Sequence, residues 1–128
     1  QHGRGVVCAD FDNDGDVDLL QLHKARGNSA TLWQNDRVSN NYLRVKLNGL
    51  APNTEAAGAR IFARIGAKTR MREVTIGSNF TSQNPTIQIF GLGTAAAVDE
   101  LTIEWPDGVM SPARLNVAAN RTLVIDHP

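Results

Sequence analysis

Five aspartates at alternate positions near the start of the chain constrain its fold more than any other feature. They fall within the stretch Asp-Phe-Asp-Asn-Asp-Gly-Asp-Val-Asp, so five carboxylates share nine residues. Charges this close repel one another strongly unless a cation lies among them. Oxygen donors without His or Cys suit a hard cation, and Gly15 allows a tight turn. The stretch predicts a metal site whose ligands are Asp10, Asp12, Asp14, Asp16 and Asp18.

Calcium is the predicted occupant of this loop. It accepts many oxygen ligands in flexible geometry, whereas magnesium prefers a strict octahedron and retains several waters. We expect the first three aspartates to bind through their side chains, Asp16 through its backbone carbonyl and Asp18 from the far side. A solvated acidic turn without a metal is the alternative.

The residues on either side of the acidic loop predict strands. Gly5 to Ala9 precede it and Val17 to Leu22 follow it, and both are short apolar runs that are partly β-branched. An EF-hand would instead need two helices and an acidic residue at the twelfth loop position, where this chain has Gln21. The predicted arrangement is a β-hairpin closed by a calcium loop.

The pattern D-x-D-x-D-G-x-x-D between two strands resembles the FG-GAP or VCBS repeat of integrin-type β-propellers. The resemblance implies that Asp10, Asp12, Asp14 and Asp18 ligate calcium, with a carbonyl ligand at Asp16. Thrombospondin-type calcium repeats share the spacing but lack the apolar flanks. We therefore expect residues 1–37 to form a partial repeat. Because Gln1 already lies inside the pattern, we also expect the chain to be a fragment or a processed product.

Residues 38–128 predict an antiparallel β-sandwich of roughly seven strands. Leu43, Val45 and Leu47 alternate with polar or aromatic residues, as in a strand with one buried face. The same alternation recurs around Ile61, Leu101 and Leu123, and Gly, Pro and Asn separate the runs. The predicted fold class is all-β: a sandwich with an N-terminal hairpin that carries the calcium loop.

This second region resembles the ASPIC/UnbV family over about ninety residues. The matching words occur in one order, and they are Asn41–Leu47, Gly58–Ile61, Arg72–Val74, Ser82–Asn84, Phe90–Gly93, Val98–Asp99, Trp105–Gly108 and Asn116–Asn120. The family is typically found at the C-terminus of secreted proteins that carry FG-GAP/VCBS repeats. The resemblance implies an extracellular or periplasmic location and brings no established activity.

Composition disfavours several functional classes. The chain has 13 Lys+Arg and 13 Asp+Glu and only 5% aromatic residues, without the basic excess of a nucleic-acid binder. No apolar run approaches the about 18–20 residues of a membrane span. His2, His23 and His127 have no neighbouring nucleophile, so we expect no enzymatic activity.

We expect a calcium-binding structural or adhesion module whose partner is a protein or a glycan at the cell surface or in the matrix. The alternative is a carbohydrate-binding sandwich, through the polar loop 78–84 or through a basic strip. That strip is Arg60, Arg64, Lys68, Arg70 and Arg72, for which the simpler expectation is pairing with Glu100 and Glu104 across strands. Open strand edges also predict self-association.

Overall fold

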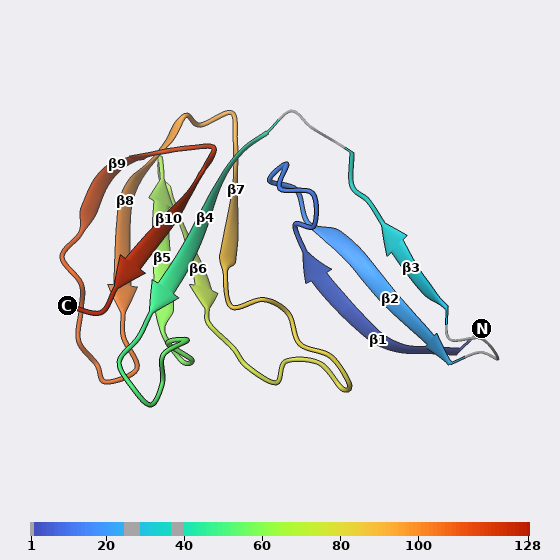
Figure 1. The fold of residues 1–128 in the computed structure, drawn as a ribbon. Helices are drawn as coiled ribbons and strands as arrows, with labels where there is room; N and C mark the ends of the chain where they lie inside the picture. The colour runs from blue at the N-terminus through green and yellow to red at the C-terminus, as the bar shows by residue number, and fades with distance from the viewer. Residues whose placement is uncertain (1, 25–28, 37–39) are drawn as a thin grey trace. The chain divides into compact units, whose positions relative to one another are not determined.

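The structure is a computed structural model that describes residues 2–24, 29–36 and 40–128 (Figure 1). Every regular element in these ranges is a β-strand, which confirms the all-β prediction. None of the described residues belongs to a helix that could cross a membrane. The strands are β1 (His2–Ala9), β2 (Asp18–Lys24), β3 (Ala30–Trp33), β4 (Asn41–Asn48), β5 (Arg60–Ile65), β6 (Lys68–Glu73), β7 (Gln88–Gly93), β8 (Ala97–Glu104), β9 (Arg114–Ala118) and β10 (Arg121–Asp126).

The chain divides into two compact units. The first contains residues 1–38 and 76–85, and the second contains residues 39–75 and 86–128. The boundary that we predicted between residues 37 and 38 lies outside the described residues. The first unit is therefore built from two stretches that are far apart in sequence.

Strands β1, β2 and β3 form the sheet of the first unit, in that order and with antiparallel pairing. Ala9 lies opposite Asp18, so the acidic stretch closes the hairpin between β1 and β2. Asn13 and Gly15 turn the loop with positive φ angles of 66° and 99°. A glycine suits the second position because a Cβ is strained in that conformation.

Side chains of the segment 76–85 cover the outer edge of β1. Asparagine, serine and threonine side chains bond to its main chain where a further strand would otherwise pair. These bonds are Asn79 Nδ2 to Val6 O (2.8 Å), Ser82 Oγ to Val6 O (2.9 Å), Thr81 Oγ1 to Arg4 O (3.2 Å) and Cys8 N to Asn84 Oδ1 (2.9 Å). The polar loop 78–84 thus lies in the first unit and not among the sandwich loops.

The second unit is a β-sandwich of the seven strands β4 to β10. One sheet has the order β10-β4-β7 and the other the order β6-β5-β8-β9. Alternate residues of both sheets form one core, in which Trp105 and Phe90 are the largest fully buried side chains. Leu43, Val45 and Leu47 are all buried, as the alternation predicted.

One pairing departs from the predicted antiparallel arrangement. β10 runs parallel to β4, and Leu123 lies opposite Val45. Asn120 fixes the start of this pair, because its N–H donates to Tyr42 O (2.6 Å) and its Oδ1 accepts from Tyr42 N (3.1 Å). The other strand pairs of the sandwich are antiparallel.

Candidate functional site

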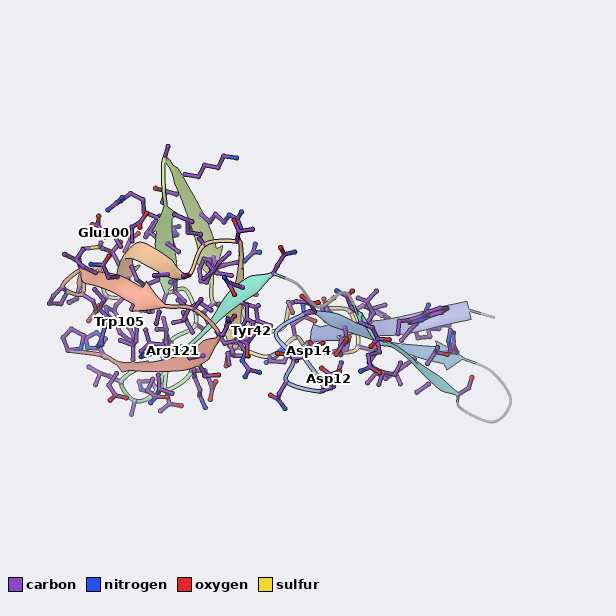
Figure 2. The ribbon with its side chains drawn as sticks, turned by 90° about the horizontal axis from the view of Figure 1, so that it is seen from above. Asp12, Asp14, Tyr42, Glu100, Trp105 and Arg121 are labelled. Carbon is purple, nitrogen blue, oxygen red and sulfur yellow. The ribbon has the colours of Figure 1, made fainter. Side chains whose placement is uncertain are left out.

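Three aspartates converge at the base of the acidic loop. Carboxylate oxygens of Asp10, Asp12 and Asp18 all lie within 4.8 Å of one another, a grouping that could hold a metal ion. Asp10 follows β1, Asp18 begins β2 and Asp12 comes from the loop between them. Asp14 lies in the same loop as Asp12 (Figure 2). Neither Asp14 nor Asp16 is part of this group.

Asp18 is the buried member of the group, with only 1% of its surface exposed. Its Oδ2 accepts a hydrogen bond from Phe11 N (2.9 Å), and its Oδ1 accepts one from Asn35 N (2.8 Å). Buried charges need such bonds because desolvation is costly. Asp18 therefore joins the start of the loop to the segment that follows β3.

Main-chain N–H groups of the loop hold the other carboxylates. Gly15 N donates to Asp10 Oδ2 (3.0 Å), Asp14 N donates to Asp12 Oδ1 (3.2 Å), and Asp16 N donates to Asp14 Oδ1 (2.9 Å). The last two bonds span two residues each, as in Asx-turns. The loop thus orders its carboxylates with its own backbone.

Unrelieved negative charge remains in the loop. The hydrogen bond from Asp16 N lowers the pKa of Asp14, but desolvation and the nearby charges of Asp12, Asp16 and Asp10 together raise that pKa above its usual value. Asp16 Oδ2 is buried and has no hydrogen-bond partner in the ranges that the structure covers. An all-oxygen donor set with this charge fits a hard cation such as calcium.

Gln34 and Asn35 belong to the surroundings of the site, and sequence analysis did not identify them. The side-chain amide of Gln34 donates to Asp12 Oδ2, and Asn35 N donates to Asp18 as described above. The sequence contains only an indirect signal for these two residues, namely the pairing of the strand that precedes them. β3 pairs with β2 so that Trp33 lies opposite Leu19, which brings the residues after β3 beside the loop.

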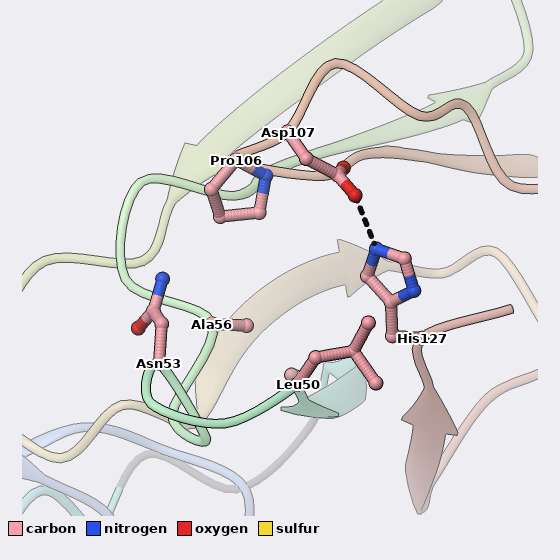
Figure 3. Close-up of a pocket in the computed structure, with 7 residues that line it drawn as sticks. Leu50, Asn53, Ala56, Pro106, Asp107 and His127 are labelled. Atoms are coloured by element: carbon pink, nitrogen blue, oxygen red, sulfur yellow. Dashed lines mark hydrogen bonds and ion pairs between the residues drawn. The ribbon is translucent and has the colours of Figure 1, made fainter.

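A separate small pocket in the sandwich surrounds the C-terminal histidine (Figure 3). Its volume is about 100 Å³, and its lining residues are Gly49, Leu50, Asn53, Ala56, Pro106, Asp107 and His127. His127 Nε2 lies 3.0 Å from Asp107 Oδ2, and Nδ1 lies 2.9 Å from Pro128 O. Both neighbours are hydrogen-bond acceptors.

The ring of His127 also packs against a buried tryptophan. The ring of His127 lies 4.7 Å from that of buried Trp105, centroid to centroid. The N–H of Val109 lowers the pKa of Asp107 most strongly, His127 lowers it further, and desolvation opposes them; the net pKa lies below its usual value. The lining includes no hydroxyl or thiol that this histidine could activate.

The predicted basic strip is largely paired. Arg60 contacts Glu73 (3.4 Å) and Glu104 (3.7 Å), and Arg64 contacts Glu100 (3.1 Å). The next two arginines of the strip donate to main-chain carbonyls of β7: Arg70 to Gly91 O, and Arg72 to Ile89 O at 3.4 Å. The expected cross-strand pairing with Glu100 and Glu104 is therefore present.

Known proteins resemble this chain over most of its length. The family model described as ASPIC and UnbV matches residues 49–128. Cartilage acidic protein 1 of Homo sapiens is 32% identical over 138 residues, which cover 98% of this chain and 19% of the relative. The Mus musculus protein of that name is 32% identical over 117 residues, and the Xenopus tropicalis one is 30% identical over 115 residues. They cover 84% and 83% of this chain.

This chain spans less than a fifth of the length of these relatives, with 17% of the mouse protein and 16% of the frog protein matched. The family match covers the greater part of the sandwich, including β5 to β10. On this match, the chain belongs to the ASPIC and UnbV family.

Proposed function

We propose that this chain is a calcium-binding, non-catalytic structural or adhesion module of a secreted protein. The observation that carries the proposal is the convergence of Asp10, Asp12 and Asp18 within 4.8 Å. Calcium takes about six to eight oxygen ligands, and carboxylates with main-chain and amide oxygens are its usual donors. Asp14 and Asp16 lie in the same loop, where Asp16 N donates to Asp14, and the side chain of Gln34 is hydrogen-bonded to Asp12. Oxygen atoms of these three residues would complete the set of ligands.

The proposed role of the ion is structural. Asp18 joins the loop to the segment after β3 through Phe11 N and Asn35 N. An ion in the loop would neutralise the carboxylates that this connection brings together, and would hold the hairpin and β3 in one arrangement.

The three-stranded sheet supports an FG-GAP/VCBS-type repeat as its origin. Residues directly opposite one another share a face, so Leu20 and Leu32 lie on one face and Leu19 and Trp33 on the other. Leu19, Leu32 and Trp33 are 43%, 53% and 60% exposed. Apolar residues on both faces are typical of a sheet that stacks between others in a repeat array.

An extracellular or periplasmic location rests on the family and its cartilage acidic protein relatives. In that setting the partner would be a protein or a glycan of the cell surface or matrix. Self-association through strand edges is part of the same proposal.

The test is a calorimetric titration of metal-stripped protein with calcium, with thermal melts in calcium and in chelator. We expect one binding event and a higher melting temperature in calcium, because a ligand that binds only the folded state stabilises it. If neither heat nor a change in melting temperature is observed, calcium binding by this chain is refuted.

Charge-matched variants identify the ligands. Asp12→Ala should weaken calcium binding at least about tenfold, and Asp14→Ala should also weaken it. Asp36→Ala is the control, since Asp36 is an exposed acid of the same unit outside the converging group. Equal affinity in all three variants would contradict the ligand assignment and leave the titration of the parent chain to decide on calcium itself.

A further inference from the structure

The outer face of the four-stranded sheet contains a shallow pocket that is separate from the metal loop. Its volume is about 160 Å³, and its lining residues are Phe62, Arg64, Thr69, Glu100 and Thr102. They come from β5, β6 and β8. Phe62 lies opposite Thr102 on one side and Met71 on the other, so its ring occupies the middle of the three strands.

The charged groups around Phe62 are paired, with carboxylates in excess over guanidiniums. Arg64 donates from Nε (3.2 Å) and Nη2 (3.1 Å) to Glu100 Oε2, and its Nη1 lies 3.8 Å from Asp99. Arg60 lies between Glu73 and Glu104 on the same face. Each guanidinium is thus accompanied by two carboxylates. Because the carboxylates outnumber the guanidiniums, this face disfavours an anionic ligand, whereas a neutral ligand meets no such repulsion.

Hydrogen-bonding capacity remains on the wall of the pocket. The bonds to Glu100 use two of the five N–H groups of Arg64 and one of the two carboxylate oxygens. The hydroxyls of Thr69 and Thr102 form no hydrogen bond to another residue within the described ranges. Donors and acceptors therefore surround an aromatic ring at close spacing.

We propose that this pocket binds a neutral sugar ring of a glycan chain. A pyranose ring has an apolar C–H face and a rim of hydroxyls, each both donor and acceptor. The C–H face would lie on Phe62, and the hydroxyls would bond to Arg64, Glu100 and the two threonines. The ion pairs hold the guanidinium and carboxylate in place before binding, which lowers the entropic cost.

The same face offers contacts to neighbouring rings of the chain. Met71 on β6 is 49% exposed, and Leu115 on β9, opposite Glu100, is 65% exposed. They extend the apolar surface to either side of the pocket across the sheet. We therefore expect an oligosaccharide to bind more tightly than a single sugar.

The experiment is an NMR titration of the full 128-residue chain with oligosaccharides. The probes are cellohexaose, maltohexaose and hexa-N-acetylchitohexaose as neutral chains, and a heparin hexasaccharide as an anionic one. We expect a neutral hexasaccharide to shift the amide resonances of β5 and β8 around Phe62. The proposal is overturned if no neutral probe does so at millimolar concentration, or if heparin alone binds.

Variants locate the binding surface. Phe62→Ala should weaken binding about tenfold through loss of the aromatic contact. Thr102→Val removes a hydroxyl at nearly constant volume and should also weaken it. Thr122→Val is the control, because exposed Thr122 lies on β10 in the other sheet. If Phe62→Ala does not fold, the sugar affinities of Thr69→Val and Thr102→Val decide whether the pocket is the binding site. Binding that survives the pocket variants overturns the proposed location.

Discussion

Asp18 has two roles that its neighbours in the acidic loop do not combine. It is a member of the converging carboxylate group, and it is also the buried acceptor for Phe11 N and Asn35 N. The second role does not depend on a metal. Substitution at this position should therefore affect the fold of the first unit even in chelator.

Asp18→Asn tests that role. Its amide nitrogen would face one of the two N–H donors, and the unsatisfied group should cost about 1–3 kcal/mol. We expect faster hydrogen exchange at the amides of Phe11 and Asn35 in chelator. Asp36→Asn is the control. Exchange at both amides as slow as in the parent chain would contradict this role.

The lowered pKa of Asp107 predicts that the sandwich loses stability in acid. Its folded-state pKa is lowered, chiefly by the N–H of Val109 and then by His127. A lowered pKa stabilises the fold at pH values above the unfolded pKa, and the stabilisation is lost as the pH falls through the folded pKa. The melting temperature should therefore decrease below about pH 4. Calorimetry should find a smaller decrease for Asp107→Asn; an equal decrease would contradict the assignment.

At the scale of strands, two of the outer strands, β1 and β7, have edges that are covered in different ways. Polar side chains of the segment 76–85 cover β1, as described above. Arg70 and Arg72 reach from β6 to the carbonyls of Gly91 and Ile89 on β7, an edge strand of the three-stranded sheet. Open carbonyls on an edge strand invite pairing with another chain.

Removing both arginines should expose the edge of β7. We expect the double variant Arg70→Thr, Arg72→Thr to self-associate more strongly than the parent chain, measured by sedimentation velocity. Lys68→Thr, on the same strand, is the control for the loss of a basic side chain, and it removes one positive charge where the double variant removes two. A sedimentation coefficient equal to that of the parent chain would show that the arginines do not protect this edge.

The local alternation of apolar and polar residues located strands that have one buried face, but it did not locate β9. The alternation of Leu43, Val45 and Leu47 located β4 correctly. β9 was missed because Leu115 is 65% exposed and Asn116 has a φ of 51°, which interrupts the alternation. The sequence also predicts a strand from Thr69 to Ile76, whereas β6 ends at Glu73.

The acidic loop was recognisable from the sequence because its five aspartates lie within nine consecutive residues. The contributions of Gln34 and Asn35 were not, since they depend on the pairing of β3 with β2. The sequence also did not predict that side chains of the segment 76–85 bond to the edge of β1. Its Asn, Ser and Thr residues suit a solvated loop as well as the edge of a strand.

At the scale of the whole chain, each unit depends on residues distant in sequence. The first needs the segment 76–85. The second needs β10, which contributes buried Leu123 and Ile125 to the core and pairs with β4. Neither the partner strand nor its parallel direction is encoded in the local pattern of β10.

Truncation after Asn120 tests the dependence of the sandwich on β10. It removes two buried side chains, each worth about 2–5 kcal/mol, together with one side of the hydrogen bonding of β4. This loss is comparable to the whole stability of a small domain. We expect no near-UV circular dichroism from Trp105. Leu123→Val should retain that signal. A native spectrum from the truncated chain would contradict the dependence.

The parallel pairing of β4 with β10 also limits when the sandwich can fold during synthesis, because both strands must first have been made. Tyr42 and Asn120, which bond to each other, are 78 residues apart. At about 5–20 residues per second, a ribosome needs roughly 4–16 s to make the second after the first. During that interval β4 lacks one of its two neighbours, and its apolar face has no complete cover. The sandwich is therefore expected to complete its fold only after β10 has left the ribosome, and nascent chains of this protein would benefit from a chaperone until then.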